Sequence, residues 1–583
     1  MDIYIALFII ILYGVKKTLK INKMNKNSAL ILSDTCAIKA QQDWSILDYV
    51  NNSSKFTYAT SLILGISIPT LSHANVQYEF PVSEYQISGN QIFSQDYLET
   101  LVAPYTGELK QVADIQKAKQ IIQEAYLSSG YGAVQVITPE QELSNGIVKI
   151  QIIESRIENI AFIGHKHFNE ANLTSSLPAL TIGKTPNIRI LSENIQLANE
   201  NPAKRIEVIL SVAQDPEELE ARVLVQDQKP LRMSVSVDNT GNSITGRTRL
   251  GAAIQHSNLF NRDHVATIAY STSPEKLDQV DIYSLSYRMP LYAIGDSIDF
   301  IYGYSSVEAA SSQTVAGPLN FSGSGRVAAL RYNHHFARKG EYSSRLIFGI
   351  ERRDYLNSCE IAGISCGSAD EDVSIRPLSL SYAAIWNTGN KVLDFYTTIS
   401  QNINGGKRGS DRDFAAVRQD ADSNYSHLRA GASWVYGLNN DWQARTALTA
   451  QFTSEPLVPG EQIGLAGATS VRGFDERAAA SDSGVVLNAE LYTPNLSKLF
   501  GLNPNQSLRA LTFYDFSSGN NRGIQNTTQA HHIDLASVGF GLRADWIGIG
   551  SLRLDVGRVV DSHKNIRQQT GDVRGHFSLN VLF

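Results

Sequence analysis

The last 353 residues of the chain, Leu231 to Phe583, alternate between apolar and polar positions in sixteen short stretches. In Leu535–Trp546, every second residue from Ala536 onward is apolar, and the residues between them are Ser, Gly, Arg and Asp. Neighbouring side chains of a β-strand point to opposite faces, so this pattern predicts strands with one apolar and one polar face. The last stretch, from Phe577, follows the same rule and ends on an aromatic residue.

Sixteen such strands in series predict a membrane β-barrel. A soluble sandwich also alternates, but Arg and Asp on the minority face fit a polar lumen inside an apolar, lipid-facing band better. This part of the chain has no uninterrupted apolar run near roughly 18 residues, which excludes helices that span a membrane. A closed barrel satisfies every backbone N–H and C=O in lipid. The expected fold is therefore a sixteen-stranded antiparallel barrel.

The gaps between the expected strands indicate the orientation of the barrel. The strands are expected to begin at Leu231, Gly246, His264, Val280, Asp296, Gly325, Tyr342, Ser374, Lys391, Tyr425, Trp442, Gly484, Ser507, Leu535, Ser551 and His576. Gaps after odd-numbered strands are often long and those after even-numbered strands are mostly short, with Pro494–Asn505 as an exception. Outer-membrane barrels have short periplasmic turns and long surface loops. Both ends of the barrel are therefore expected in the periplasm of a Gram-negative bacterium.

Residues 75–230 mix helical and strand periods instead. Apolar positions at helical spacing predict an amphipathic helix near Ile115–Tyr126, and strands are expected at Val134–Ile137 and Val148–Ile153. A second unit repeats this order, with a helix and two strands at Ile190–Asn199, Arg205–Ser211 and Leu219–Val225. The chain therefore predicts two copies of a small α+β module, 75–155 and 156–230, ahead of the barrel at 231–583.

Residues 1–74 are expected to be a presequence. Two apolar segments, Ala6–Val15 and Tyr58–Leu71, each lie next to lysine, and the second ends close to a small-residue cleavage sequence. Signal peptidase is expected to cut between Ala74 and Asn75. A signal has one apolar core, so one interpretation is translation from Met24 with an extended signal. A short membrane anchor at residues 3–15 is the alternative.

Composition adds an exclusion and one covalent candidate. The net charge is −6, so the chain offers no basic field for nucleic acid. Of its 3 cysteines, Cys359 and Cys366 lie in the mature chain, within one expected surface loop. An oxidising compartment and an even count favour a disulfide between them. Two unpaired thiols are the alternative.

No motif for catalysis or metal binding stands in its usual structural context. The His-Glu-x-x-His zinc motif does not occur, and the Gly-x-Ser-x-Gly match at Gly363–Gly367 falls in an expected surface loop rather than between a strand and a helix. The closely spaced histidines lack a nearby set of carboxylates and are expected to be solvated: His165, His167, His334, His335, His531 and His532. We therefore expect no enzyme, no metal and no cofactor.

Two α+β modules before a sixteen-stranded barrel resemble the two-partner-secretion (TpsB) transporters. These are the haemolysin and filamentous-haemagglutinin exporters (ShlB/FhaC/HecB) of the BamA/TpsB superfamily. The modules look like POTRA domains, and Val471-Arg472-Gly473-Phe474 resembles the superfamily's VRG(F/Y) tip. The tip falls in the sixth expected surface loop, loop 6, at about 457–483, where that family carries it. The resemblance covers residues 79–583.

The same resemblance implies a partner for Arg472. Family members place an acidic residue in a barrel-wall motif F-x-D-x-G, and this chain has Phe513–Ser517 at the matching position, with Ser517 replacing the glycine. We expect loop 6 to fold into the lumen and Arg472 to form a buried pair with Asp515. The planar guanidinium offers a carboxylate several donors at once. Glu490 is an alternative partner.

The function implied by the resemblance is an outer-membrane pore that exports a large β-helical protein in unfolded form without ATP. The POTRA domains are expected to capture this cognate, TpsA-like protein by β-augmentation. Other expected partners are outer-membrane lipid, including LPS, and the barrel assembly machinery, which would recognise Phe583. The chain is expected to be a monomer. Cleavage after Ala74 leaves too few residues before the first POTRA strand for the plug helix of some members, so we expect either no plug helix or a different cleavage site. A BamA-type assembly factor is the alternative, although it would carry three or more POTRA domains.

Overall fold

The computed structural model describes residues 79–583 apart from short internal segments. Those segments are 143–144, 243–244, 308–309, 316, 322–323, 357–359, 362–363, 366–371, 504–505 and 524–529. The expected presequence, its cleavage site at Ala74 and Asn75, and both Cys359 and Cys366 lie outside the described residues.

The first module, residues 79–155, combines two helices with a three-stranded sheet in the order β2-β5-β4. Its elements are β1 Phe80–Val82, β2 Glu84–Ser88, α2 Gln95–Val102, η1 Ala103–Tyr105, β3 Gly107–Lys110, α3 Val112–Ser128, β4 Gln135–Ile137 and β5 Ile147–Ile153. Every second residue of β5 from Val148 to Ile152 is buried, in one core with Ile122 and Tyr126 of α3. The alternating strand and the helical stripe expected here are both confirmed.

The second module, residues 156–230, repeats this arrangement. Its elements are β6 Arg156–Ile163, α4 Glu170–Ser176, α5 Ile188–Ala198, β7 Lys204–Val212 and β8 Glu218–Asp227. As β5 does in the first module, β8 lies in the centre of three strands, parallel to β6 and antiparallel to β7. The expected repeat of a small α+β unit is therefore confirmed. Within the described residues, no helix is long and apolar enough to cross a membrane.

Asp227, the last residue of β8, fixes the turn that leads into α4. Its Oδ2 accepts hydrogen bonds from the backbone N–H groups of Lys166 (2.8 Å), His167 (2.7 Å) and Phe168 (2.9 Å). Partial burial raises the pKa of the Asp227 carboxyl, but the three backbone donors outweigh burial and hold it below its usual range.

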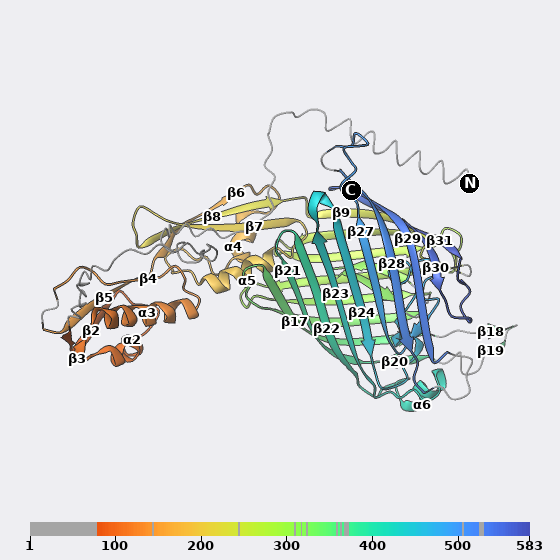
Figure 1. Cartoon of the computed structure of the whole chain (residues 1–583), viewed down its shortest axis with the longest axis horizontal. Helices are drawn as coiled ribbons and strands as arrows, with labels where there is room; N and C mark the ends of the chain where they lie inside the picture. The colour runs from red at the N-terminus through yellow and green to blue at the C-terminus, as the bar shows by residue number, and fades with distance from the viewer. Residues whose placement is uncertain are drawn as a thin grey trace, which may run out of the picture. The chain divides into compact units, whose positions relative to one another are not determined.

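The rest of the chain forms a closed antiparallel barrel (Figure 1). Its strands are β9 Leu231–Asp238, β10 Arg249–Leu259, β11 His264–Thr272, β12 Ile282–Leu291, β13 Asp296–Ser305, β16 Gly325–His335, β17 Tyr342–Tyr355, β20 Val373–Ile375, β21 Pro377–Asn387, β22 Lys391–Asn402, β23 Ser426–Gly437, β24 Gln443–Phe452, β27 Ser483–Tyr492, β28 Gln506–Asn520, β29 His532–Trp546, β30 Gly550–Asp561 and β31 Val573–Leu582. Both β20 and β21 pair with β17 and form one interrupted strand, so the barrel has the sixteen strands expected.

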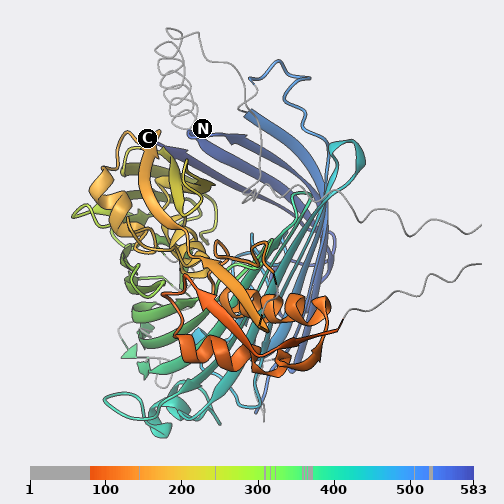
Figure 2. The same ribbon diagram turned by 90° about the vertical axis from the view of Figure 1, so that its left-hand side faces the viewer.

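The two faces of the barrel wall differ as the alternation predicts. On β29, Phe540 is 72% exposed on the outer face, whereas Ser537 is fully buried on the inner one. Ile268 and Ile350 are likewise exposed on other strands. The outer surface therefore suits lipid and the inner surface is polar. Figure 2 shows the strands of this curved wall side by side.

The seam of the barrel lies between its first and last strands. β31 pairs with β9 from Ser578↔Asp238 to Leu582↔Ser234. Beyond this ladder, the N–H of Phe583 donates to the carbonyl of Met233 (2.9 Å), and the Met233 N–H donates back (3.3 Å). The backbone of the C-terminal residue thus belongs to the seam, while its aromatic ring is exposed.

Small elements occupy the loops between barrel strands. They are β14 Ala310–Thr314, β15 Gly317–Phe321, β18 Glu360–Ile361, β19 Ile364–Ser365, α6 Asp411–Val417, η3 Asn439–Asp441, η4 Pro459–Glu461, β25 Ile463–Gly464 and β26 Ala480–Ser481. The hairpin of β14 and β15 lies against the inner face of the wall, because the Val315 N–H donates to the buried Ser286 hydroxyl on β12 (2.8 Å). The sequence did not predict this hairpin.

A buried ion pair joins the second module to the short turns of the barrel. Lys204 of β7 contacts the carboxylate of Asp263 in the turn between β10 and β11, and neither side chain is measurably exposed. The Lys204 ammonium also donates to Asn172 (3.1 Å), while the Tyr292 hydroxyl donates to Asp263 (2.6 Å). Burial lowers the pKa of Lys204, and the Asp263 carboxylate partly offsets that effect.

A second contact beside this pair corrects one prediction. His335 was expected to be solvated, but its side chain is buried and its Nδ1 lies 3.5 Å from a carboxylate oxygen of Glu200. Glu200 also binds Arg288 and Arg345, each at 3.0 Å. The expectation was wrong because two adjacent histidines in a sequence do not indicate an acidic partner that is distant in the chain. His531 and His532 are exposed.

Candidate functional site

The candidate site is the tip of loop 6, which runs from 453 to 482 between β24 and β27. A short ladder of β25 with β26 closes its stem, and a bridge joins Ala466 to Val471 near the tip. Val471 and Phe474 are fully buried, and Arg472 is 3% exposed. Leu535 and Val559 of the wall share their apolar core. The tip therefore packs against the inner wall.

Arg472 makes its principal contact with Asp515 of β28. Its Nε and Nη2 donate to the two carboxylate oxygens at 2.7 and 2.8 Å, which is the bidentate geometry that arginine favours. The backbone N–H of Arg472 donates to the same carboxylate at 3.1 Å. Asn488 of β27 links the two sides, because its amide donates to Asp515 (2.8 Å) and to the carbonyl of Ser470 (2.7 Å).

Two more carboxylates complete the surroundings of Arg472. Its Nη1 lies 2.8 Å from Glu490 of β27 and 3.2 Å from Asp555 of β30. Glu490, the alternative partner in the sequence, is thus in contact together with Asp515. Arg445 binds Glu490 (3.0 Å) and Arg543 binds Asp555 (2.9 Å). Three arginines therefore face three carboxylates, so the cluster has no formal net charge, and Arg445 at its edge is partly exposed.

Aromatic and glycine residues of the wall form the seat of the tip. The Arg472 guanidinium lies 3.5 Å from the centroid of the Phe513 ring, a cation–π contact. On the adjacent strands, Phe513 is paired with Gly539, and Gly539 with Gly557. An added Cβ at Gly539 would meet the Phe513 ring at 2.4 Å, and one at Gly557 would meet the Gly473 nitrogen at 2.9 Å. The two glycines therefore leave the space that the ring and the tip fill.

The backbone conformation at position 473 requires glycine. Its φ of +96° is in the region that other residues rarely adopt. Its N–H donates to Nε2 of His576 on β31 at 3.0 Å. Through Arg472 and Gly473, the tip is hydrogen-bonded to β28, β30 and β31, and ion-paired to β27.

The residues after the tip continue the attachment. Asp475 binds Arg574 of β31, and the amide of Gln568 donates to it at 2.7 Å. Burial raises the pKa of the Asp475 carboxyl, but Gln568, Arg574 and Arg567 together hold it below its usual range. Before the tip, the buried Glu461 accepts from Arg353 (2.8 Å) and from the Tyr355 hydroxyl (2.6 Å) of β17. Both limbs of loop 6 are therefore bound to the wall.

The sequence identified some of these residues and missed others. It singled out Arg472, Asp515 and Glu490, which the structure brings together in one cluster. It missed Asp555 and the seat formed by Gly539 and Gly557. Glycines at opposed positions of neighbouring strands were a usable signal, since a strand glycine often marks a close backbone approach. With all three guanidinium nitrogens in contact with carboxylates, Arg472 is suited to holding the loop rather than to chemistry.

Family models match most of the chain. One described as "Haemolysin secretion/activation protein ShlB/FhaC/HecB" matches residues 220–544, more than half of the chain. A model of the ShlB-type POTRA domain matches residues 80–155, the first module.

Individual relatives are similar over most of their length. The heme/hemopexin transporter protein HuxB of Haemophilus influenzae (strain 86-028NP) is 23% identical over 85% of this chain and 86% of its own. The outer membrane transporter CdiB of Dickeya dadantii is 22% identical over 71% and 72%. Among solved structures, CdiB from Escherichia coli has a TM-score of 0.67 at 18% identity, covering 88% of this chain and 93% of its own. CdiB from Acinetobacter baumannii has a TM-score of 0.62 at 19% identity, covering 87% and 90%.

Proposed function

The chain belongs to the haemolysin secretion/activation protein family ShlB/FhaC/HecB, and we propose that it exports one cognate secreted protein through its barrel lumen. Members of this family are outer-membrane transporters of two-partner secretion, and the POTRA domains that precede their barrels are periplasmic. The short turns of this barrel therefore face the periplasm, and loop 6 begins and ends at the cell surface.

The two modules are proposed to be the capture device. We divide the chain into POTRA domain 1 (75–155), POTRA domain 2 (156–230) and the barrel (231–583). The sheet orders place β2 and β4 at the edges of the first domain and β6 and β7 at the edges of the second. An extended segment of the secreted protein adds to such an edge through backbone hydrogen bonds, and side-chain pockets supply the selectivity.

The observation that carries the proposal is the charge-balanced cluster around Arg472. It supports a role in which loop 6 is held inside the lumen in one defined position while the transporter is at rest. The polar inner wall suits an extended, hydrated chain. Folding of the exported protein outside the cell would draw it outward without ATP. No catalytic residue and no cofactor has a part in this mechanism.

Biogenesis and assembly belong to the same proposal. We expect the protein to be a monomer in outer-membrane lipid and LPS. Its Phe583 ring is exposed at the seam, where the barrel assembly machinery can recognise a terminal aromatic residue. Cys359 and Cys366 are proposed to form a disulfide within their surface loop.

Deletion of the gene tests the proposed function. We expect one large surface-exposed or released protein to disappear while other outer-membrane barrels keep their normal levels. Re-expression of the wild-type chain should restore that protein. A general loss of barrels would instead identify an assembly factor of BamA type, and no change in any exported protein would refute export.

A further inference from the structure

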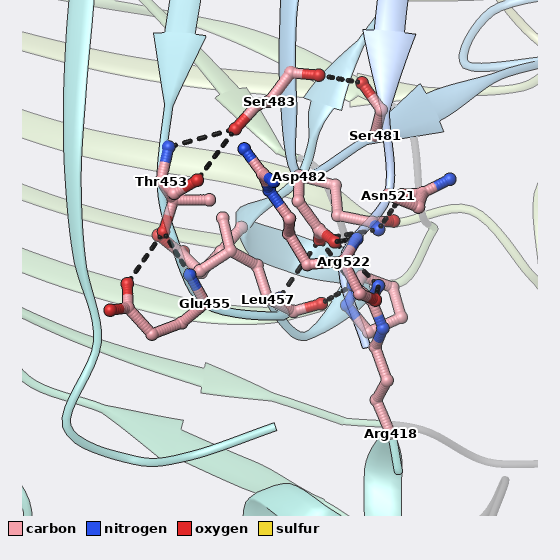
Figure 3. Close-up of polar contacts among 12 residues, drawn as sticks. Arg418, Thr453, Glu455, Leu457, Ser481, Asp482, Ser483, Asn521 and Arg522 are labelled. Atoms are coloured by element: carbon pink, nitrogen blue, oxygen red, sulfur yellow. Dashed lines mark hydrogen bonds and ion pairs between the residues drawn. The ribbon is translucent and has the colours of Figure 1, made fainter. Parts of the chain in front are cut away.

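Asp482 is a buried carboxylate on which three surface loops meet. It is the last residue of loop 6, directly before β27, and its side chain is fully buried. Its Oδ1 accepts from the Leu457 N–H (3.0 Å) and from the Gln462 amide (3.0 Å), both in the first limb of loop 6. Its Oδ2 accepts from the Arg522 N–H (2.7 Å), at the start of loop 7 directly after β28. Figure 3 shows Leu457 and Arg522 next to Asp482.

Loop 5, residues 403–425, reaches the same carboxylate through Arg418. The Arg418 guanidinium is bidentate on Asp482, with Nη2 at 2.7 Å from Oδ2. It also donates to the carbonyl of Leu457 and, at 3.1 Å, to that of Arg522. One side chain of loop 5 therefore binds all three partners, and only 11% of it is exposed.

Apolar packing holds the same loops together. α6 of loop 5 buries Phe414 completely, in one cluster with Tyr425 of loop 5 and Leu457 and Val458 of loop 6. Ile375 of β20 belongs to this cluster, which attaches it to the wall. Figure 1 places α6 beyond the ends of β22 and β24. The loops thus form a small folded unit at the surface end of the barrel.

Asp482 itself is fixed to the wall. Its backbone carbonyl accepts from the buried Gln451 amide of β24 (2.9 Å), and the same amide donates to the carbonyl of Glu461 (3.0 Å). The next residue, Ser483, bonds to Thr453 at the end of β24 in both directions, each at 3.0 Å. Asp482 is therefore fixed to the wall together with the first part of loop 6, and the groups able to separate from it are Arg418 of loop 5 and the backbone of Arg522.

We propose that the Arg418–Asp482 pair is a latch that holds loop 5 against loop 6 at the surface mouth of the resting pore and is released when the exported chain passes. The inference rests on the proposed export function. The latch differs from the Arg472 cluster in place and partners, because Arg472 anchors the tip on β27, β28 and β30. Release of the latch opens the mouth without moving the tip.

Ion conductance of the purified full-length protein in planar lipid bilayers tests the latch. Arg418→Gln removes the bidentate charge but leaves Asp482 and the wall intact. Loss of charged hydrogen bonds from the closed state should raise its open probability by about tenfold. Arg412→Gln, at an exposed position of α6 in the same loop, is the matched control and should behave as wild type. Equal open probabilities for wild type and Arg418→Gln would overturn the latch.

A second variant distinguishes the latch from a general loss of structure. Asp482→Asn keeps the shape of the side chain and removes its charge. Only protein that forms an inserted, heat-modifiable barrel is included in the comparison. The double variant should open no more than the stronger single variant, since both changes remove one interaction. Additive increases would mean that the two residues act separately and would contradict the latch.

Export in cells separates this inference from the proposed function. If the wild-type chain exports its partner and Arg418→Gln leaves conductance unchanged, the latch is wrong and the exporter stands. If the wild-type chain exports no protein, the proposed function is wrong whatever the conductance. With an intact exporter, Arg418→Gln should increase ion leakage across the outer membrane while export continues.

Discussion

Arg472 shows at the scale of one residue why this site requires arginine. Its bidentate bond to Asp515, its contacts with Glu490 and Asp555 and its stacking on Phe513 use the planar fork and the flat π-face together. A lysine ammonium is a point charge and has neither property. Removal of the guanidinium leaves three buried carboxylates with two arginines, and breaking one side of a buried pair costs roughly 3–5 kcal/mol.

The Asp227 carboxylate gives a pH-dependent prediction at the same scale. Its pKa is lower in the folded protein than in the unfolded chain, so its contribution to stability is present above the unfolded pKa, near roughly 3.9. That contribution is lost as the pH falls through the lower folded value. We expect protection of the 166–168 amides against hydrogen exchange, corrected for intrinsic rates, to decrease in this acidic range.

Asp227→Asn is the control for that effect. The variant should show weaker protection of the same amides at neutral pH and no further decrease on acidification. Equal protection in wild type and variant at all pH values would mean that the three backbone contacts of Asp227 do not stabilise the turn.

The residue scale also shows where sequence reasoning succeeds and where it ends. The resemblance pointed to Arg472 and Asp515 because each lies in a short motif. Asp555 and His576 lie in ordinary alternating strands, and their selection depends on which strands the tip crosses. Which strands lie under the tip is a property of the folded barrel, so no local sequence pattern predicts it.

At the scale of elements, the tip of loop 6 packs into a space that two glycines leave in neighbouring strands. Gly539 of β29 and Gly557 of β30 are directly opposed. The alternation predicted both strands but treated these glycines as ordinary inner-face positions. Their role appears only when the ring of Phe513 and the backbone of Gly473 are placed over them.

Gly557→Ala tests whether the tip of loop 6 needs the space that this glycine leaves. The new Cβ would lie 2.9 Å from the Gly473 nitrogen and 3.0 Å from the Arg472 carbonyl carbon, so the tip must shift. We expect a cost of roughly 1–3 kcal/mol, typical of overpacking, and faster hydrogen exchange in residues 467–474.

Gly575→Ala on β31 is the matched control, because its added Cβ has 3.9 Å to the nearest atom. It should leave exchange in loop 6 unchanged. Similar behaviour of the two variants would contradict a specific contact between the tip and Gly557.

The strands themselves were predictable to within three residues of their observed starts. Their signal is strong because one face must be apolar for lipid and the other polar for the lumen. The hairpin of β14 and β15 lacks that constraint, since it packs inside the barrel and has no lipid face. α6 is similarly a local element of a surface loop, and its packing partners are remote in sequence.

At the scale of the whole molecule, Lys204 and Asp263 connect a periplasmic domain to the barrel. Neither residue was predicted, because a lone lysine in a strand and an aspartate in a turn are usually solvated. Both are buried here, with Tyr292 and Asn172 satisfying the remaining polar atoms. The attachment of this domain to the barrel therefore depends on both residues of the ion pair.

Lys204→Met should destabilise this attachment by roughly 3–5 kcal/mol, because Asp263 is left buried without its counter-charge. Hydrogen exchange of α4 and of the 260–263 turn in the full-length protein measures the effect. Lys184→Met, an exposed lysine of the same domain, should have no effect. The double variant Lys204→Met/Asp263→Asn should recover part of the loss, and a double variant worse than Lys204→Met would contradict the account.

Export by a transporter whose loop 6 tip has been released is the most direct test of the central claim. In cells that produce equal amounts of inserted, heat-modifiable barrel, the exported partner is measured for wild type, Arg472→Ala, Asp515→Asn and the double variant. The account predicts that each single variant loses most export and that the double variant is no worse, because both changes remove the same attachment. Export by Arg472→Ala at the wild-type rate would contradict it.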